Sequence, residues 1–251
     1  MLSNQYVKPT SRKFFVFFLL TFFLLFGCGL AHKEQVRVTP EGLYQTGLEH
    51  YQKADYRKAV ESFQKLKDEY PLSKLAVLAE LGIADSHFSE GNYIEAEAAY
   101  SDFLILHPAN SNLPYIIYQI GLCHYNQIHG IDRDQTETMK ARKEFEKLLS
   151  LYPDSQYTFT AGSLLKDCKR RLAEHEFYVG RFYYKSQKYK AALKRFETVI
   201  REYPNMGLDL KVTYFIKETK KLIEIADKQE LKKGPADKDK KEQDSKDRKG
   251  A

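Results

Sequence analysis

Residues 56–71 have the sequence YRKAVESFQKLKDEYP, in which an alanine is followed four residues later by an aromatic residue, seven later by an apolar residue and twelve later by a proline. This spacing occurs four times. The four sets are Ala59, Phe63, Leu66 and Pro71; Ala96, Tyr100, Phe103 and Pro108; Ala141, Phe145, Leu148 and Pro153; and Ala192, Phe196, Val199 and Pro204. Spacings of four and seven share one helical face, and the proline cannot continue the helix. The pattern therefore predicts four helices that each stop before a proline.

Another helix-forming segment precedes each of these helices. Twelve residues before the alanine, three sets have a small residue, Gly47, Ala84 or Gly180, which lets the two helices approach closely. This unit is similar to the tetratricopeptide repeat, a helix-turn-helix of about 34 residues. The resemblance implies an all-α, right-handed superhelical solenoid of about five repeats over residues 39–231. A final helix from about Leu210 to Lys232 would form an incomplete fifth repeat or a cap.

Two irregularities interrupt the repeat. From Pro108 to Pro153 the spacing is 45 residues, which predicts an eight-residue loop around Ile128–Gln135 between the two helices of the third repeat. From Pro153 to Pro204 it is 51 residues. The excess is close to four helical turns, so we predict a lengthened first helix in the fourth repeat, from about Tyr157 to Ser186.

The N-terminus has the features of a secretory signal. Residues 1–27 contain basic residues, no acidic residue and an apolar run over 14–26 that is shorter than the roughly 20 residues a membrane span needs. The run ends in Leu25-Phe26-Gly27-Cys28, which resembles the bacterial lipobox. We therefore expect a signal peptide over 1–27, lipid on Cys28 and a lipidated tether over 28–38. Because Gly29, and not aspartate, follows the cysteine, the Gram-negative sorting rule points to the periplasmic face of the outer membrane.

The net charge of +6 lies at the two ends of the chain. Three positive charges fall in 1–27, and a further excess of three falls in 232–251. The body is therefore near neutral, and nothing in it indicates a nucleic-acid partner. Residues 232–251 contain no aromatic or branched aliphatic residue, so we predict a disordered charged tail.

No pattern of catalytic chemistry is present. Cys123 and Cys168 are predicted to be two buried thiols, although a disulfide in an oxidising periplasm is the alternative. His50 and His87 occupy the same repeat position, which indicates a shared, half-buried packing role. We find no phosphate-binding glycine loop, no Gly-x-Ser-x-Gly element and no metal-ligand spacing. The sequence therefore predicts a non-enzyme without catalytic residues, metal or cofactor.

The repeats offer a binding surface instead. In tetratricopeptide stacks, positions five and twelve of the first helix face the concave groove, and these two positions are large and mostly aromatic here. They are Tyr44 and Tyr51, Leu81 and Phe88, Tyr118 and Tyr125, and Phe177 and Tyr184. With Asp85 and Arg181 as polar groups at position nine, they predict an aromatic trough for an extended peptide. The alternative is that the rings pack between neighbouring repeats.

Several motifs indicate a particular family. They are Asp68-Glu69-Tyr70-Pro71, Leu106-His107-Pro108, Pro114-Tyr115, Asp132-Arg133-Asp134-Gln135, Tyr152-Pro153-Asp154-Ser155-Gln156-Tyr157 and Ile200-Arg201-Glu202-Tyr203-Pro204. With the lipobox and the long fourth repeat, the chain resembles, over about residues 26–225, the BamD family of tetratricopeptide lipoproteins.

The resemblance implies a non-enzymatic subunit of the outer-membrane β-barrel assembly machinery. The N-terminal repeats would receive unfolded outer-membrane proteins, with Tyr70 matching a tyrosine implicated in substrate contact. The C-terminal repeats would dock the barrel subunit BamA, with Arg201 at the position of the family's interface arginine, and other assembly lipoproteins would be partners. A second hypothesis is another periplasmic tetratricopeptide lipoprotein, either a secretin pilotin or an envelope-coordination factor.

Overall fold

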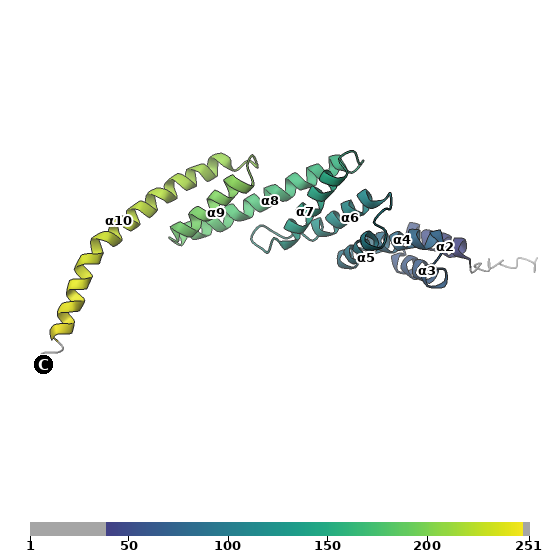
Figure 1. The fold of residues 1–251 in the computed structure, drawn as a ribbon, viewed down its shortest axis with the longest axis horizontal. Coiled ribbons are helices and arrows are strands. Elements are labelled where there is room, and N and C mark those ends of the chain that lie inside the picture. The colour runs from purple at the N-terminus through teal and green to yellow at the C-terminus, as the bar shows by residue number, and fades with distance from the viewer. Residues whose placement is uncertain (1–38, 248–251) are drawn as a thin grey trace, which may run out of the picture.

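The structure is a computed structural model that describes residues 39–247, with side chains described as far as Glu230. Within this range the chain folds into nine α-helices and contains no strand. The helices are α2 (Pro40–Gln52), α3 (Tyr56–Glu69), α4 (Lys74–Glu90), α5 (Tyr93–Leu106), α6 (Leu113–Tyr125), α7 (Thr136–Leu151), α8 (Thr158–Lys185), α9 (Tyr189–Glu202) and α10 (Asp209–Asp247). They form an elongated stack (Figure 1).

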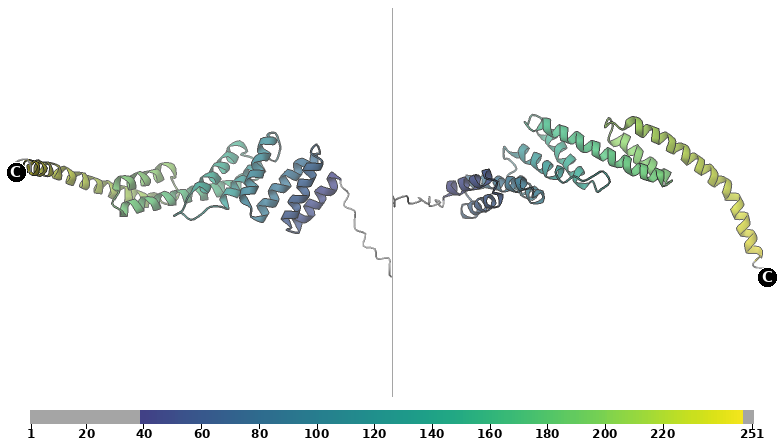
Figure 2. Two further views of the ribbon diagram at one scale, coloured as in Figure 1. Left: turned by 90° about the horizontal axis from the view of Figure 1, so that it is seen from below. Right: turned by 180° about the vertical axis from the view of Figure 1, so that it is seen from behind.

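Successive helices pair into four helical hairpins, α2–α3, α4–α5, α6–α7 and α8–α9, each of which is one repeat. Each helix packs against the helices before and after it in the chain, and α10 packs on α9. Figure 2 shows the same one-directional stack from two further sides. The predicted all-α solenoid of tetratricopeptide type is therefore confirmed.

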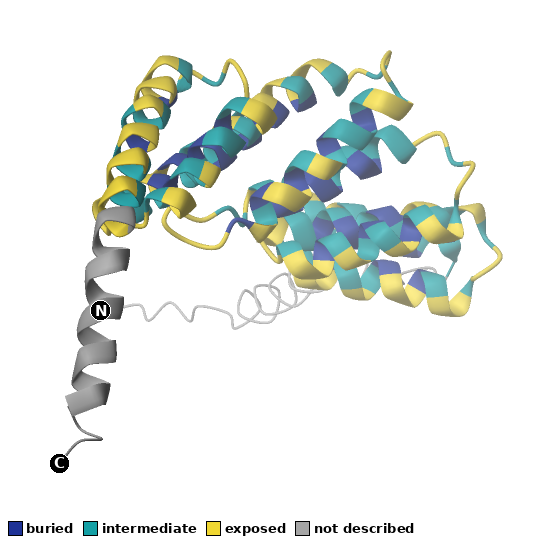
Figure 3. Ribbon diagram, turned by 60° about the vertical axis from the view of Figure 1, so that its left-hand side comes forward, coloured by how far each residue is buried: buried dark blue, intermediate teal, exposed yellow. Residues whose placement is uncertain are grey.

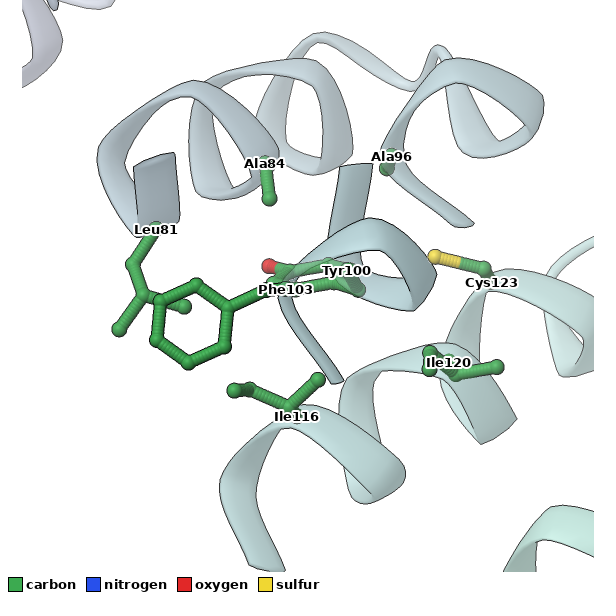
Figure 4. Close-up of a cluster of buried hydrophobic side chains, with 8 residues drawn as sticks. All are labelled: Leu81, Ala84, Ala96, Tyr100, Phe103, Ile116, Ile120 and Cys123. Carbon is green, nitrogen blue, oxygen red and sulfur yellow. The ribbon is translucent and has the colours of Figure 1, made fainter. Parts of the chain in front are cut away.

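The core of each repeat is a contact between a small residue on the first helix and an aromatic ring on the second. A Cβ atom added to Gly47 would lie 2.4 Å from Phe63, and one added to Gly121 would lie 2.5 Å from Phe145. Because these distances are shorter than any real contact, only glycine allows the helices to approach this closely. In the second repeat the contact is made by Ala84 and Tyr100, which gather with their neighbours between α4, α5 and α6 (Figure 4).

The turn inside a repeat requires a left-handed residue at the same position. Gly91 occupies it with φ of 86°, and Ala54 and Gln187 occupy it in the first and fourth repeats with φ of 58° and 59°. The next N–H then reaches back to a carbonyl five residues earlier, as from Asn92 to His87 at 2.9 Å. This is the backbone pattern of a helix that ends in a left-handed cap.

Both predicted irregularities are confirmed. Residues 126–135 connect α6 to α7 and are held by Gln135, whose Nε2 donates to the carbonyl of Gly130 at 2.9 Å and to that of Arg133 at 3.0 Å. His175 of α8 also lies 2.7 Å, through Nδ1, from the carbonyl oxygen of Ile131. The long first helix of the fourth repeat is α8, Thr158–Lys185.

The final helix differs from its prediction. We expected it to end near Lys232 and a disordered tail to follow over 232–251, but α10 continues to Asp247. The prediction rested on the lack of aromatic and branched aliphatic residues. Lys is common in this segment and favours helix, but Gly234, Pro235 and four Asp residues disfavour it, so intrinsic propensity does not explain the extension. Residues 248–251 lie outside the described residues, as do the predicted signal peptide and tether.

The two cysteines of the solenoid are buried and unpaired, so the prediction of two buried thiols is confirmed. Burial raises the thiol pKa of Cys123 and of Cys168 to about 12. Over residues 39–247, no helix has both the length and the apolar character that crossing a membrane requires.

Candidate binding surface on the first helices

The residues predicted to line a trough lie on the first helices of successive repeats. Six of them, which we call the first-helix face, belong to the first three repeats. They are Tyr44 and Tyr51 on α2, Asp85 and Phe88 on α4, and Tyr118 and Tyr125 on α6. All six are half-buried. Each side chain therefore packs partly inside the solenoid and is partly exposed to solvent. The packing between repeats and the exposed area that a trough would need both occur at these residues.

The aromatic rings at position twelve of the first helices are held by contacts with the second helix of the same repeat. Tyr51 packs edge-on against Tyr56, with ring centroids 5.5 Å apart, and Phe88 packs in the same way against Tyr93 at 5.4 Å. Tyr51 also shares a hydrogen bond of 2.9 Å with Ser89 of the next repeat. These rings are thus held in place before any ligand arrives, which lowers the entropy cost of binding.

Asp85 is the centre of a hydrogen-bond network and not a free polar group. Its Oδ1 accepts from the hydroxyl of Tyr100 at 2.5 Å and from that of Tyr115 at 2.6 Å, and Gln119 donates to Tyr115 at 2.8 Å. Burial raises the pKa of Asp85, and the two tyrosine hydrogen bonds offset only part of this effect. Burial, with Asp85 close by, also raises the pKa of Tyr44. The network joins the second repeat to the third.

Tyr118 and Tyr125 join the third repeat to the fourth. Tyr118 stacks on Tyr157 with centroids 5.1 Å apart. The hydroxyl of Tyr125 donates to Asp167 of α8 at 2.9 Å, and Arg171 donates to the same oxygen at 2.6 Å. Burial acts to raise the pKa of Asp167, but hydrogen bonds from Arg171, Arg170 and Tyr125 outweigh it and lower that pKa to about 2.

The remaining predicted site residues lie apart from this face. Tyr70 follows α3 in the turn between the first two repeats and is half-buried. Arg201 lies near the end of α9, with 69% of its side chain exposed, and donates to the adjacent Glu202 at 2.9 Å. Cys28 lies outside the described residues. The structure therefore brings the first-helix face together but keeps Arg201 at a separate surface in the fourth repeat.

A hollow of about 470 Å³ opens between the turn before α6 and the turn before α8. Its apolar lining includes Tyr115, Tyr152, Pro153 and Tyr157, and Ser155 and Gln156 add polar groups. Tyr157 also stacks on Tyr118, so the hollow is continuous with the first-helix face. It lies beside the face's C-terminal end.

The polar groups at this surface are engaged in hydrogen bonds and, at Asp167, in ion pairs with Arg170 and Arg171. His50 and His87 are half-buried, as predicted from their equivalent positions. Across the described side chains, no three His, Cys, Asp or Glu residues come together in a way that could hold a metal ion. The surface is therefore suited to contacts with a peptide through aromatic rings and hydrogen bonds.

Sequence reasoning missed four residues that contact the first-helix face: the fully buried Tyr100, and Tyr115, Tyr157 and Asp167. One signal for Tyr100 was available: the other three repeats have phenylalanine at its position, so a hydroxyl there needed a buried acceptor. No comparable signal marked Asp167, because its partner Tyr125 lies 42 residues away, across an inserted loop.

A family model described as "YfiO: Outer membrane lipoprotein" matches residues 37–233. The chain belongs to this family. It is 31% identical over 185 residues to the "Outer membrane protein assembly factor BamD" of Rickettsia prowazekii, covering 74% of each chain. It is also similar to the proteins of that name from Vibrio cholerae, at 27% identity over 74% of this chain and 82% of the relative, and from Caulobacter vibrioides, at 28% over 65% of this chain and 53% of the relative.

The family match spans α2 to α9, and so it contains the first-helix face, the inserted loop and the long α8. The family resemblance inferred from the sequence motifs is thereby confirmed. The hollow beside Tyr157 is lined by two of those motifs, residues 114–115 and 152–157. Three tyrosines of those motifs, Tyr115, Tyr152 and Tyr157, therefore line one hollow.

Proposed function

We propose that this protein is a lipid-anchored, non-enzymatic subunit of the outer-membrane β-barrel assembly machinery at the periplasmic face of the outer membrane. The observation that carries the proposal is the family match over residues 37–233, which includes the irregular third and fourth repeats and not only the generic repeat pattern. The relatives' shared name, outer membrane protein assembly factor, supports the same role. The lipobox at Cys28 supports the anchor.

The first-helix face is the proposed binding surface for unfolded outer-membrane proteins. Its half-buried rings offer flat apolar area at fixed positions, which suits an extended segment rich in aromatic residues. No energy-coupling step is required of this chain, because binding and handing over a segment need only a partner that inserts it. Tyr70 would contribute at the N-terminal end of this path.

The C-terminal repeats are the proposed docking surface for a BamA-like barrel subunit and for other assembly lipoproteins. Arg201 supports this, since its guanidinium is largely exposed and forms an ion pair with the adjacent Glu202. An exposed arginine on a rigid helix can exchange such a weak surface pair for a carboxylate on a partner.

Affinity purification from detergent-solubilised outer membranes, with mass spectrometry of the co-eluting proteins, tests the docking role. We expect a BamA-like barrel protein with the unchanged chain and much less of it with Arg201→Glu. Arg57→Glu, an exposed arginine of α3, is the matched control and should retain the partner. If no barrel protein elutes, the proposal is wrong; a secretin in its place would favour the pilotin hypothesis.

Peptide binding tests the first-helix face. Replacing Tyr51 and Phe88 together by leucine keeps apolar packing but removes the rings, and we expect roughly tenfold weaker binding of a peptide with a C-terminal aromatic residue. Phe182→Leu, on an exposed part of α8, is the control. Unchanged affinity in the double variant, with helicity retained, would rule out this face as the peptide site.

A further inference from the structure

The two long edges of the solenoid are chemically different. Because neighbouring helices are antiparallel, every turn within a repeat lies at one edge, and every turn between repeats lies at the other. Figure 3 shows the turns between repeats along the upper and right-hand margin and the turns within repeats on the opposite side. We call the margin formed by segments 70–73, 107–112, 152–157 and 203–208, with the helix ends that flank them, the inter-repeat edge.

Each turn of the inter-repeat edge exposes at least one large apolar side chain. Single exposed apolar residues are normal on a protein surface, but here two positions repeat: one lies two residues before the proline of a repeat and the other six residues after it. They are Leu72, 100% exposed; Leu106, 64%; Leu151, 58%; Phe159, 87%; and Leu210, 91%. None of these belongs to the first-helix face, so peptide binding there does not account for them.

The charged residues of the inter-repeat edge, among them Glu69, Lys74, Arg201 and Asp209, lie at the flanking helix ends and, with one exception, not in the turns. The four connecting segments of this edge contain a single Asp, Glu, Lys or Arg residue, Asp154. The connecting segments of the opposite edge contain six. These are Lys53, Asp55, Asp132, Arg133, Asp134 and Lys188. Tyr152 and Tyr157 are half-buried on the inter-repeat edge, where tyrosine can sit between an apolar and a wet environment. This composition is typical of a surface that meets the headgroup region of a bilayer.

The chain enters the solenoid at the same edge. Helix α2 begins at Pro40, and as a first helix its N-terminus lies beside the inter-repeat turns. Residues 29–38 can span at most about 35 Å from the lipid expected on Cys28. The apolar edge is thus the edge closest along the chain to the membrane anchor. An anchor of this length keeps the edge at high effective concentration at the bilayer, so weak apolar contacts are sufficient to orient it.

We propose that the inter-repeat edge rests on the lipid surface, with Leu72, Phe159 and Leu210 in the headgroup region of the bilayer. This inference rests on the lipid anchor of the proposed function. It holds the solenoid lengthwise along the membrane, with the turns within repeats facing the periplasm. The first-helix face then opens sideways, beside the bilayer, where a segment can pass to a neighbouring membrane-embedded partner.

Lipid quenching of fluorescent labels tests the proposal on the full-length, lipidated protein in vesicles of phosphatidylethanolamine and phosphatidylglycerol. Leu72, Phe159 and Leu210 are changed to cysteine one at a time and labelled. Cys123 and Cys168 are fully buried and do not compete for the label. Ile94→Cys and Phe182→Cys provide matched controls, because they are also exposed apolar positions, 68% and 61%, but lie near the opposite edge.

With headgroup-attached nitroxide lipids, we expect the three edge labels to lose most of their fluorescence and the two control labels to keep most of theirs. Equal quenching at both edges, or none at either in protein that floats with the vesicles, overturns this inference alone. Edge labels that are protected only after purified outer-membrane proteins are added also overturn it, in favour of a protein partner. Failure of the protein to float with the vesicles contradicts the lipid anchor, and with it both proposals.

Discussion

The junction between the second and third repeats and the junction between the third and fourth use the same device with different chemistry. In each, a carboxylate on a first helix accepts a hydrogen bond from a tyrosine of α6. Tyr115 donates to Asp85, and Tyr125 donates to Asp167. Asp85 is half-buried and accepts from two neutral hydroxyls, whereas Asp167 also binds Arg170 and Arg171. The same inter-repeat link can therefore be made neutral or charged.

Removal of the two carboxylates should change the stability of the junctions most, and by different amounts. Asp85→Ala leaves the hydroxyl of fully buried Tyr100 without its acceptor, so we expect a loss of about 2 kcal/mol in the free energy of unfolding. Asp167→Ala leaves two arginines that are partly exposed and can bind water, so we expect a loss below about 1 kcal/mol. Urea unfolding followed by circular dichroism measures both, with Asp102→Ala on the exposed face of α5 as the control.

A second variant identifies the cause of the larger loss. Adding Tyr100→Phe to Asp85→Ala removes the stranded hydroxyl and restores the phenylalanine that the other three repeats have at this position. We expect the double variant to be more stable than Asp85→Ala alone. If it is not, an unsatisfied hydroxyl is not the source of the loss, and the two junctions differ for another reason.

Removing the hydroxyl of one tyrosine of α6 at a time should give smaller losses of stability and show how much each junction depends on its tyrosine. Tyr115→Phe leaves Asp85 with one donor, and we expect a cost of about 1 kcal/mol. Tyr125→Phe leaves two guanidinium donors on Asp167, so we expect a cost below that of Tyr115→Phe. Thermal unfolding of the two single variants, measured side by side, gives the order. The reverse order would show that the charged junction depends more on its tyrosine than the neutral one does.

The regular parts of this fold could be predicted from the sequence because they depend on local spacing. The pairing of Gly47 with Phe63 and the helix end before Pro71 are both set within one repeat, and the inserted loop and long α8 appeared as excess residues between prolines. The end of α10 could not be predicted in this way, because residues 232–247 have no apolar pattern and contain Gly234 and Pro235, which disfavour helix.

The junctions could not be predicted because their partners are distant in the chain. Asp85 was identified as a polar group on the first-helix face, but its two tyrosine donors lie 15 and 30 residues away. Which of several tyrosines reaches it depends on the angle between repeats, and no spacing in the sequence encodes that angle. The same holds for the inter-repeat edge, where residues such as Leu72 and Leu210 become neighbours of one surface only once the repeats are stacked.

The pH dependence of stability gives the smallest effect, but one that separates the junctions by sign. The pKa of Asp85 is raised in the folded protein, so its contribution is fully present below its unfolded value of about 3.9 and is lost as the pH rises through the raised value. The pKa of Asp167 is lowered to about 2, so its contribution is present above about 3.9 and is lost as the pH falls towards 2. Relative to the unchanged protein, Asp85→Asn should therefore gain stability as the pH rises from about 3.5 to about 7, and Asp167→Asn should lose it. The free energy of unfolding of each variant, minus that of the unchanged protein, is measured across this range. This difference cancels the titration of the other groups. If it changes with pH in the same direction for both variants, the contrast between a neutral and a charged junction is wrong.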